Sequence, residues 1–104
     1  MPKQLVITKQ TDADLLNITS YLQSEWGNKV VDDFLTELTD FYQFVVLQPR
    51  AFAYYIKSEN IRKHNVKNIN LILYRVTKTR IEIIAILDGR MNPKAIKKVA
   101  RKRL

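Results

Sequence analysis

The chain contains no cysteine, one histidine and two glycines among its 104 residues. Without cysteine, neither a disulfide framework nor a thiolate metal site can form. The remaining metal ligands are mostly carboxylates, and the adjacent pair Asp32-Asp33 points to different faces of a helix. Neither Gly27 nor Gly89 lies in a loop that would cradle a phosphate. We therefore expect no metal site and no small-molecule cofactor.

Long apolar runs are also missing. The first one, Leu5-Val6-Ile7, is too short for a signal peptide, and a membrane-spanning helix needs roughly 20 apolar residues. The C-terminal stretch PKAIKKVARKRL is amphipathic, but its apolar stripe is thin and lacks aromatic anchors. We expect a soluble cytoplasmic protein with no membrane partner, and the absence of cysteine is compatible with a reducing compartment.

The charge is unevenly distributed along the chain. Residues 1–49 hold three basic residues against seven acidic ones, a net charge of −4, whereas residues 50–104 hold fifteen against three, a net charge of +12. Such asymmetry favours a polyanionic partner, namely nucleic acid, a membrane surface or an acidic protein. The length and the 46% hydrophobic content fit one domain over residues 1–104, with a basic tail at residues 93–104.

Two segments carry apolar residues at helical spacing. The first begins at Thr11-Asp12, with Asp14 as an acid in its first turn, and is broken by Gly27-Asn28. The second runs from there to Pro49, which ends it. Trp26 closes the apolar stripe of the first segment, and we expect it to pack in the core or between the helices. The two segments therefore predict an antiparallel helical hairpin.

Four segments are predicted to be strands: Lys3–Thr8, Ile61–Lys67, Asn70–Val76 and Arg80–Leu87. The last three follow one another with short links that suit antiparallel hairpins. The order is β-α-α-β-β-β, and the simplest α+β fold for it packs the helical hairpin on one face of a sheet. The first strand has no sequence neighbour and must join by a non-local contact. Leu73, Ile84 and Ile86 are the expected core residues of the sheet.

Two segments are less clear. Residues 51–60 include Phe52, Tyr54 and Tyr55 but show no clean period, so a loop containing a strand or a helical turn fits them. The tyrosines there suit either core packing or stacking on bases. Pro93 onward fits a short helix with cationic faces. This tail has three readings: a nucleic-acid contact, a dock for an acidic partner segment, or a frayed end.

Several stretches together resemble the RelE/ParE toxin superfamily of bacterial type II toxin–antitoxin pairs, closer to the ParE-like branch. They are a helix reading ADLLNITSYLQSEWG, a second helix ending LQP, and the strands NINLILYRV and IEIIAILDGRMNP. The most specific parts are YRV on the middle strand and GRMNP at the end of the last one. The similarity runs from about Leu5 to Pro93. It implies a twisted antiparallel sheet facing a helical hairpin, and a cognate antitoxin as partner.

The resemblance implies one of two activities. ParE-like toxins poison DNA gyrase, a topoisomerase, and are not nucleases, whereas RelE-like toxins cleave mRNA on the ribosome. A ribonuclease of this fold needs a base, an acid and cations for the phosphorane charge. This chain offers four candidates for such catalysis, Arg62, His64, Arg75 and Arg90.

The sequence departs from the RelE-like pattern near its end. After Arg90 there is no Tyr, His, Asp or Glu, so the usual C-terminal acid or base is missing. Asp88 stands where many relatives have a histidine, and an aspartate is a poor proton donor near neutral pH unless its pKa is raised. This difference favours a non-enzymatic inhibitor of gyrase, with a ribosome-dependent mRNA endoribonuclease and a non-toxic binding relative as alternatives.

Strand alternation puts Arg62 and His64 on one face and Lys63 on the other, and sets Arg75 opposite Tyr74. For each of these residues a structural role is the alternative to a functional one. His64 would then be a surface or hydrogen-bonded residue, and the arginines would form ion pairs. Arg90 is the strongest candidate, because its guanidinium follows the last strand and presents a planar fork to a phosphate or carboxylate. The residues expected to bind target or nucleic acid are Arg90, Arg62, Lys63, Lys94, Lys97, Lys98 and Arg101.

Overall fold

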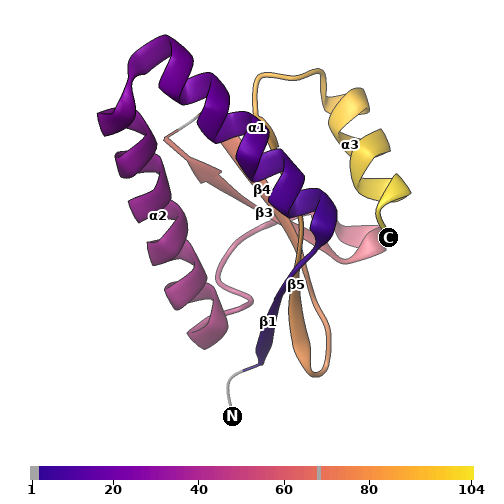
Figure 1. The fold of residues 1–104 in the computed structure, drawn as a ribbon. Helices are drawn as coiled ribbons and strands as arrows, with labels where there is room; N and C mark the ends of the chain where they lie inside the picture. The colour runs from indigo at the N-terminus through magenta and orange to yellow at the C-terminus, as the bar shows by residue number, and fades with distance from the viewer. Residues whose placement is uncertain (1–2, 68) are drawn as a thin grey trace.

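The computed structural model describes residues 3–67 and 69–104, and its central element is one mixed sheet of five strands. Figure 1 shows the sheet with a helical hairpin and a separate C-terminal helix around it. The strands lie in the order β1-β5-β4-β3-β2. Their bounds are Gln4–Ile7 (β1), Tyr54–Ile56 (β2), Ile61–Val66 (β3), Asn70–Val76 (β4) and Arg80–Asp88 (β5). This arrangement confirms the α+β fold predicted from the sequence.

The sheet is antiparallel except at one pair of strands. The pairs β2–β3, β3–β4 and β4–β5 are antiparallel as expected, but β1 runs parallel to β5, with Leu5 opposite Ile81. The expectation of a wholly antiparallel sheet is therefore corrected at this edge. No hairpin turn ties β1 to its neighbour, since two helices follow it in the chain. The predicted non-local pairing of the first strand is confirmed.

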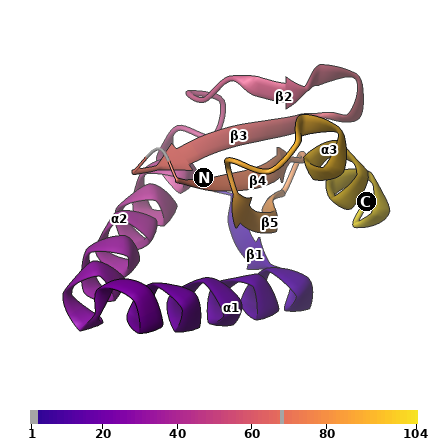
Figure 2. The same ribbon diagram turned by 90° about the horizontal axis from the view of Figure 1, so that it is seen from above.

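The helical hairpin consists of α1, Lys9–Trp26, and α2, Asn28–Leu47, joined by Gly27 alone. Gly27 has a φ of 89°, a conformation that residues with a Cβ rarely adopt, and this glycine lets the chain reverse in a single residue. Figure 2 shows both helices on the same side of the sheet. The side chains of Gln23 and Asn28 are hydrogen-bonded at 2.9 Å across the turn.

The first helix begins earlier than the sequence suggests. Thr8, in extended conformation, caps α1 by accepting a hydrogen bond from the N–H of Thr11 on its side-chain oxygen, at 3.2 Å. Thr11 is fully buried, and its hydroxyl donates to the carbonyl of Ile83 at 2.8 Å. The predicted start at Thr11-Asp12 is therefore wrong by about one turn. Trp26, expected in the packing, is 66% exposed at the end of α1.

The two faces of the sheet carry separate cores. The face under the hairpin buries Phe34, Leu38 and Phe41 of α2 against Tyr74 and Ile86 of the sheet. The other face buries Leu73 and Ile84 against α3, Pro93–Lys102, whose Ile96 and Ala100 are almost fully buried. The three residues predicted for the core are thus buried, but they divide between two faces.

The segment between α2 and β3 contains both elements that the sequence left open. Strand β2 pairs with β3 at the edge of the sheet, and a 3₁₀ turn, η1, follows at Lys57–Glu59. The C-terminal tail forms the helix α3, which both views place at the opposite end of the molecule from α2. Because α3 is docked on the sheet, the reading of the tail as a frayed end is wrong. Among the described residues, we find no helix with both the length and the apolar character that crossing a bilayer requires.

One ion pair fixes α1, β5 and α3 relative to each other. The register between β4 and β5 shifts at Ile84, which has no partner on β4 because Leu73 pairs with Ala85 and Tyr74 with Ile83. Arg103 donates to the Ile84 carbonyl at 3.1 Å and to Asp14 of α1 at 2.6 Å and 3.1 Å. Asp14 also accepts the N–H of Ile86 at 3.0 Å. We call this group, Asp14, Ile84, Ile86 and Arg103, the β5 clamp.

Replacing Asp14 by alanine should destabilise the protein by about 2–4 kcal/mol, because the side chain of Arg103, only 19% exposed, would lose its carboxylate and the Ile86 N–H would lose its acceptor. Asp33→Ala is the matched control, since Asp33 pairs with Lys29 on the exposed surface and should change stability by less than about 0.5 kcal/mol. Urea denaturation of both variants measures the difference. Equal effects in the two variants would contradict a structural role for the clamp.

Candidate functional site

His64 lies between the sheet and α2, inside a group of aromatic rings. Its imidazole stacks on Phe41 with ring centroids 4.7 Å apart and packs against Phe52 at 4.5 Å. Burial lowers the pKa of His64 below its ordinary value, and the nearby carboxylate of Glu37 opposes this only in part. The imidazole is therefore neutral at pH 7 and acts as a packing residue on the hairpin side of the sheet.

Arg62 shares the face of His64, as the strand alternation predicted, but it is 92% buried. Its guanidinium donates to the carbonyl of Phe52 at 2.7 Å and lies over the Tyr54 ring, 4.0 Å from the centroid. These contacts hold the segment that leads from α2 into β2. Arg62 therefore has a structural role here and presents no open guanidinium to a ligand.

Arg75 and Tyr74 point to opposite faces, and the structure places Tyr74 under the hairpin. The Tyr74 hydroxyl donates to the carbonyl of Pro49 at 3.1 Å, and burial raises the pKa of Tyr74 to about 12. Arg75 lies on the α3 side of the sheet, 3.8 Å from Glu82 on β5. Glu82 also pairs with Arg80 at 3.2 Å. Arg75 thus forms an ion pair across two strands.

Arg90 is exposed just beyond β5, and its partner is the carboxylate two residues earlier. Two nitrogens of the guanidinium donate to the two oxygens of Asp88 at 3.0 Å and 2.9 Å. The hydrogen bonds from Arg90 hold the pKa of Asp88 below its usual value, so Asp88 is ionised at pH 7 and cannot donate a proton. Arg90 remains accessible to an anion that can compete with Asp88.

Gly89 positions this arginine by a close backbone approach. Its N–H donates to the carbonyl of Ile69 at 2.6 Å, and a Cβ at this position would lie 3.1 Å from the same oxygen. A larger residue would push the end of β5 away from the segment that precedes β4. This contact explains why a glycine precedes Arg90 at the end of a core strand.

The structure therefore does not gather the four candidates for RNA cleavage. Arg62 and His64 face the hairpin, Arg75 lies on the opposite face of the sheet, and Arg90 follows the end of β5. Each arginine has a carbonyl or carboxylate partner within the described chain, and the neutral imidazole is packed between rings. General acid–base catalysis requires groups that converge on one reacting phosphate, which this arrangement lacks among the described residues.

The lysines expected to bind a target are grouped on the α3 side of the sheet. Lys63 of β3 and Lys97 of α3 lie over the Tyr55 ring of β2, at 5.7 Å and 5.8 Å from its centroid. Lys94 and Lys98 are exposed one turn apart on α3. The nearby Arg101 donates to Glu59 at 2.8 Å and is thus partly neutralised. We call Lys63, Lys94, Lys97 and Lys98, together with Tyr55, the α3 cationic surface.

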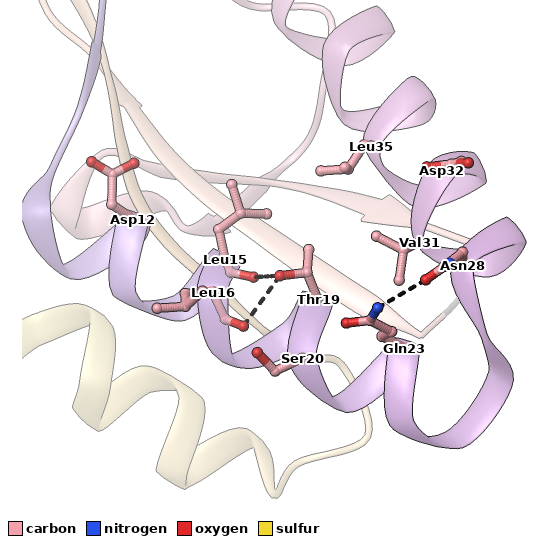
Figure 3. Close-up of a pocket in the computed structure, with 10 residues that line it drawn as sticks. All are labelled: Asp12, Leu15, Leu16, Thr19, Ser20, Gln23, Asn28, Val31, Asp32 and Leu35. Atoms are coloured by element: carbon pink, nitrogen blue, oxygen red, sulfur yellow. Dashed lines mark hydrogen bonds between the residues drawn. The ribbon is translucent and has the colours of Figure 1, made fainter.

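A second surface, which sequence reasoning missed, is a groove of about 480 Å³ between the two helices of the hairpin. Figure 3 shows its ten lining residues, which come from α1 and α2 alone. Its apolar part is formed by Leu15, Leu16, Val31 and Leu35, and its polar lining includes Asp12 and Asp32. Leu16 is 67% exposed. The sequence does contain one sign of this groove. Leu16 is apolar but lies outside the apolar stripe of the first helix, which faces the sheet.

Comparison with known proteins identifies relatives of this chain. A family model described as "ParE toxin of type II toxin-antitoxin system, parDE" matches residues 5–93. A solved structure, "Chromosomal ParDE TA system from P. aeruginosa", has a TM-score of 0.69 at 15% sequence identity, covering 83% of this chain and 95% of that chain. At that identity the similarity shows the fold. No curated protein matches the chain. The family match ends at Pro93, the first residue of α3.

Because the pKa of His64 is lowered, we expect acid to destabilise the protein already at pH values higher than those at which carboxylates titrate. The unfolded chain takes up a proton near pH 6.5 while the folded protein resists it, so stability falls as the pH decreases from about 7.5 to 5.5. His64→Phe keeps the ring packing and should remove this part of the pH dependence. NMR titration of the imidazole should give a midpoint below 6.5, and a midpoint above 6.5 would contradict its burial.

Proposed function

The chain belongs to the family of ParE toxins of type II toxin–antitoxin systems, and we propose that it arrests bacterial growth by poisoning DNA gyrase, a topoisomerase. We further propose that it acts in the cytoplasm and that a cognate antitoxin neutralises it by covering part of its surface. In this proposal the protein works by binding and not by catalysis.

The observation that carries the proposal is the separation of Arg62, His64, Arg75 and Arg90. Arg62 is buried under the hairpin, Arg75 pairs with Glu82 on the other face, and Arg90 pairs with Asp88. A ribonuclease would need several of these groups around one phosphate, with a proton donor beside them. The ionised Asp88 is not such a donor. A toxin with this arrangement is better suited to hold an enzyme–DNA complex than to cut RNA.

The α3 cationic surface supports a target that contains DNA or a strongly acidic protein surface. Lys94 and Lys98 are exposed, and no ion pair involves either of them within the described part of the chain. Unpaired lysines on one face of a helix neutralise phosphates and release counterions, which strengthens binding at low salt. We propose that this surface, with Arg90 beside the start of α3, contacts the gyrase–DNA complex.

The hairpin groove supports a contact with the antitoxin. Leu16 and Leu35 expose apolar side chains along a groove formed by two helices, which suits the apolar face of an amphipathic helix. The groove lies on α1 and α2, whereas the α3 cationic surface lies on the other side of the sheet. The antitoxin segment that fills the groove would then need to continue across the molecule to cover the target surface.

Purified protein should trap DNA that gyrase has cleaved, and the trapping should depend on α3. We expect Lys94→Glu/Lys98→Glu to require at least about tenfold more protein for the same linear DNA, because two phosphate-neutralising charges are reversed. Lys9→Glu/Lys29→Glu makes the same charge change on the hairpin and should behave as wild type. If wild-type protein arrests growth but traps no cleaved DNA at a molar excess over gyrase, the proposed target is wrong.

Leu16→Glu should weaken neutralisation by the antitoxin without unfolding the toxin, because the exposed leucine contributes to the groove and not to the core. We expect co-expressed antitoxin to protect cells from wild-type toxin, and about tenfold more antitoxin to be needed for the variant. Asn17→Glu adds the same charge at the next, exposed position of α1, outside the groove. Equal protection against both variants would exclude the groove as the antitoxin contact.

A further inference from the structure

A second concave surface lies at the other edge of the hairpin, where α2 meets β3 and the segment before β2. It is an open pocket of about 390 Å³, lined by Glu37, Asp40, Phe41, Phe44, Phe52 and His64. The pocket shares no residue with the hairpin groove, and the α3 cationic surface lies on the opposite face of the sheet. Neither the gyrase contact nor the antitoxin groove proposed above uses it.

The floor of this pocket is a continuous set of four rings. Phe44 meets Phe52 edge to face at 5.6 Å, Phe52 contacts His64 at 4.5 Å, and His64 stacks on Phe41 at 4.7 Å. Phe44 is 46% exposed although it is a large apolar side chain. Aromatic faces carry partial negative charge, so an exposed ring such as Phe44, supported by its partly buried neighbours, attracts a cation with a flat or apolar body.

Two carboxylates of α2 complete the pocket. Glu37 and Asp40 are three residues apart on the helix, so both side chains reach the same side of it. Glu37 lies 3.4 Å from Lys67, an exposed pair. Asp40 is exposed and, within the described residues, takes part in no salt bridge. The pocket therefore combines a free carboxylate with ring faces on a protein whose net charge is +8.

We propose that this pocket, which we call the α2 aromatic pocket, binds an arginine side chain presented by a partner protein segment. The planar guanidinium would lie on the ring of Phe44, with the Phe52 ring at its edge, while its N–H groups donate to Asp40 and Glu37. Arginine fits better than lysine because its delocalised, weakly hydrated cation stacks on rings and forms two parallel hydrogen bonds to a carboxylate. Charge complementarity selects this occupant, since an acidic side chain would be repelled by both carboxylates.

This inference does not depend on the gyrase proposal, because the pocket is defined by its own rings and carboxylates. It predicts that a cation binds at this pocket although the protein as a whole is positively charged. A protein with a net charge of +8 repels cations at long range, so a cation that binds here must be held by short-range contacts. Added salt screens this long-range repulsion. It should therefore weaken cation binding at the pocket less than it weakens anion binding at the α3 cationic surface.

The test is an NMR titration of the full-length protein with two blocked peptides, acetyl-Gly-Arg-Gly-amide and acetyl-Gly-citrulline-Gly-amide. Citrulline has the shape of arginine without its charge. We expect the arginine peptide to shift the ring signals of Phe44, Phe52 and His64, with a dissociation constant on the order of millimolar, and the citrulline peptide to bind at least about tenfold more weakly.

Two variants assign the binding to this pocket. Asp40→Asn and Phe44→Ala should each weaken the arginine peptide by at least about threefold, and both positions are exposed enough for the fold to be retained. Glu25→Gln removes an exposed carboxylate of α1 that lines neither this pocket nor the hairpin groove, and should leave binding unchanged. Equal binding of the two peptides, or shifts that persist in both pocket variants, would overturn the proposal.

Discussion

The carboxylate of Asp14 joins three parts of the molecule that are far apart in sequence. Strand β1 ends at Ile7, so beyond Ile83 the outer edge of β5 has no strand to pair with. At the register shift, the Ile84 carbonyl and the Ile86 N–H have partners outside the sheet. Arg103 donates to the carbonyl, and Asp14 accepts from the N–H. Because Asp14 belongs to α1 and Arg103 follows α3, the same contact sets the position of the hairpin and of the cationic helix. The placement of the hairpin groove relative to the α3 cationic surface therefore depends on the β5 clamp.

The sheet divides the molecule electrostatically as well as sterically. The hairpin carries most of the acidic residues of the chain, while the lysines of β3 and α3 gather on the other face. Two of the arginines considered as catalytic candidates form structural contacts instead: Arg62 holds the segment before β2, and Arg75 links β4 to β5. Of the residues expected to bind a target, Arg90, Lys94 and Lys98 are exposed, a distribution that suits recognition of an extended anion.

Much of this fold could be predicted because the relevant patterns are local. The spacing of apolar residues gave the hairpin, and strand alternation placed Arg62 with His64 and Tyr74 opposite Arg75. Contacts between distant residues carried no local signal. Asp14 lies where an acidic residue favours a helix start, but its partner Arg103 is 89 residues away, and the unpaired Ile84 depends on the register between two strands. Thr11-Asp12 has the composition of a helix start, whereas the buried hydrogen bond from Thr11 to Ile83 joins residues that are distant in the sequence. The hairpin groove and the α2 aromatic pocket also have no local signal, because the first forms where α1 packs on α2 and the second where α2 packs on β3 and Phe52.

We propose that this ParE-family chain acts by binding and not by cleaving RNA. Primer extension on cellular mRNAs, shortly after the protein is induced without its antitoxin and with Arg90→Ala alongside, distinguishes these two activities. We expect growth to stop while the mRNAs remain intact. Cuts at codon positions within reading frames, absent in the Arg90→Ala strain, would contradict it and show a ribosome-dependent ribonuclease.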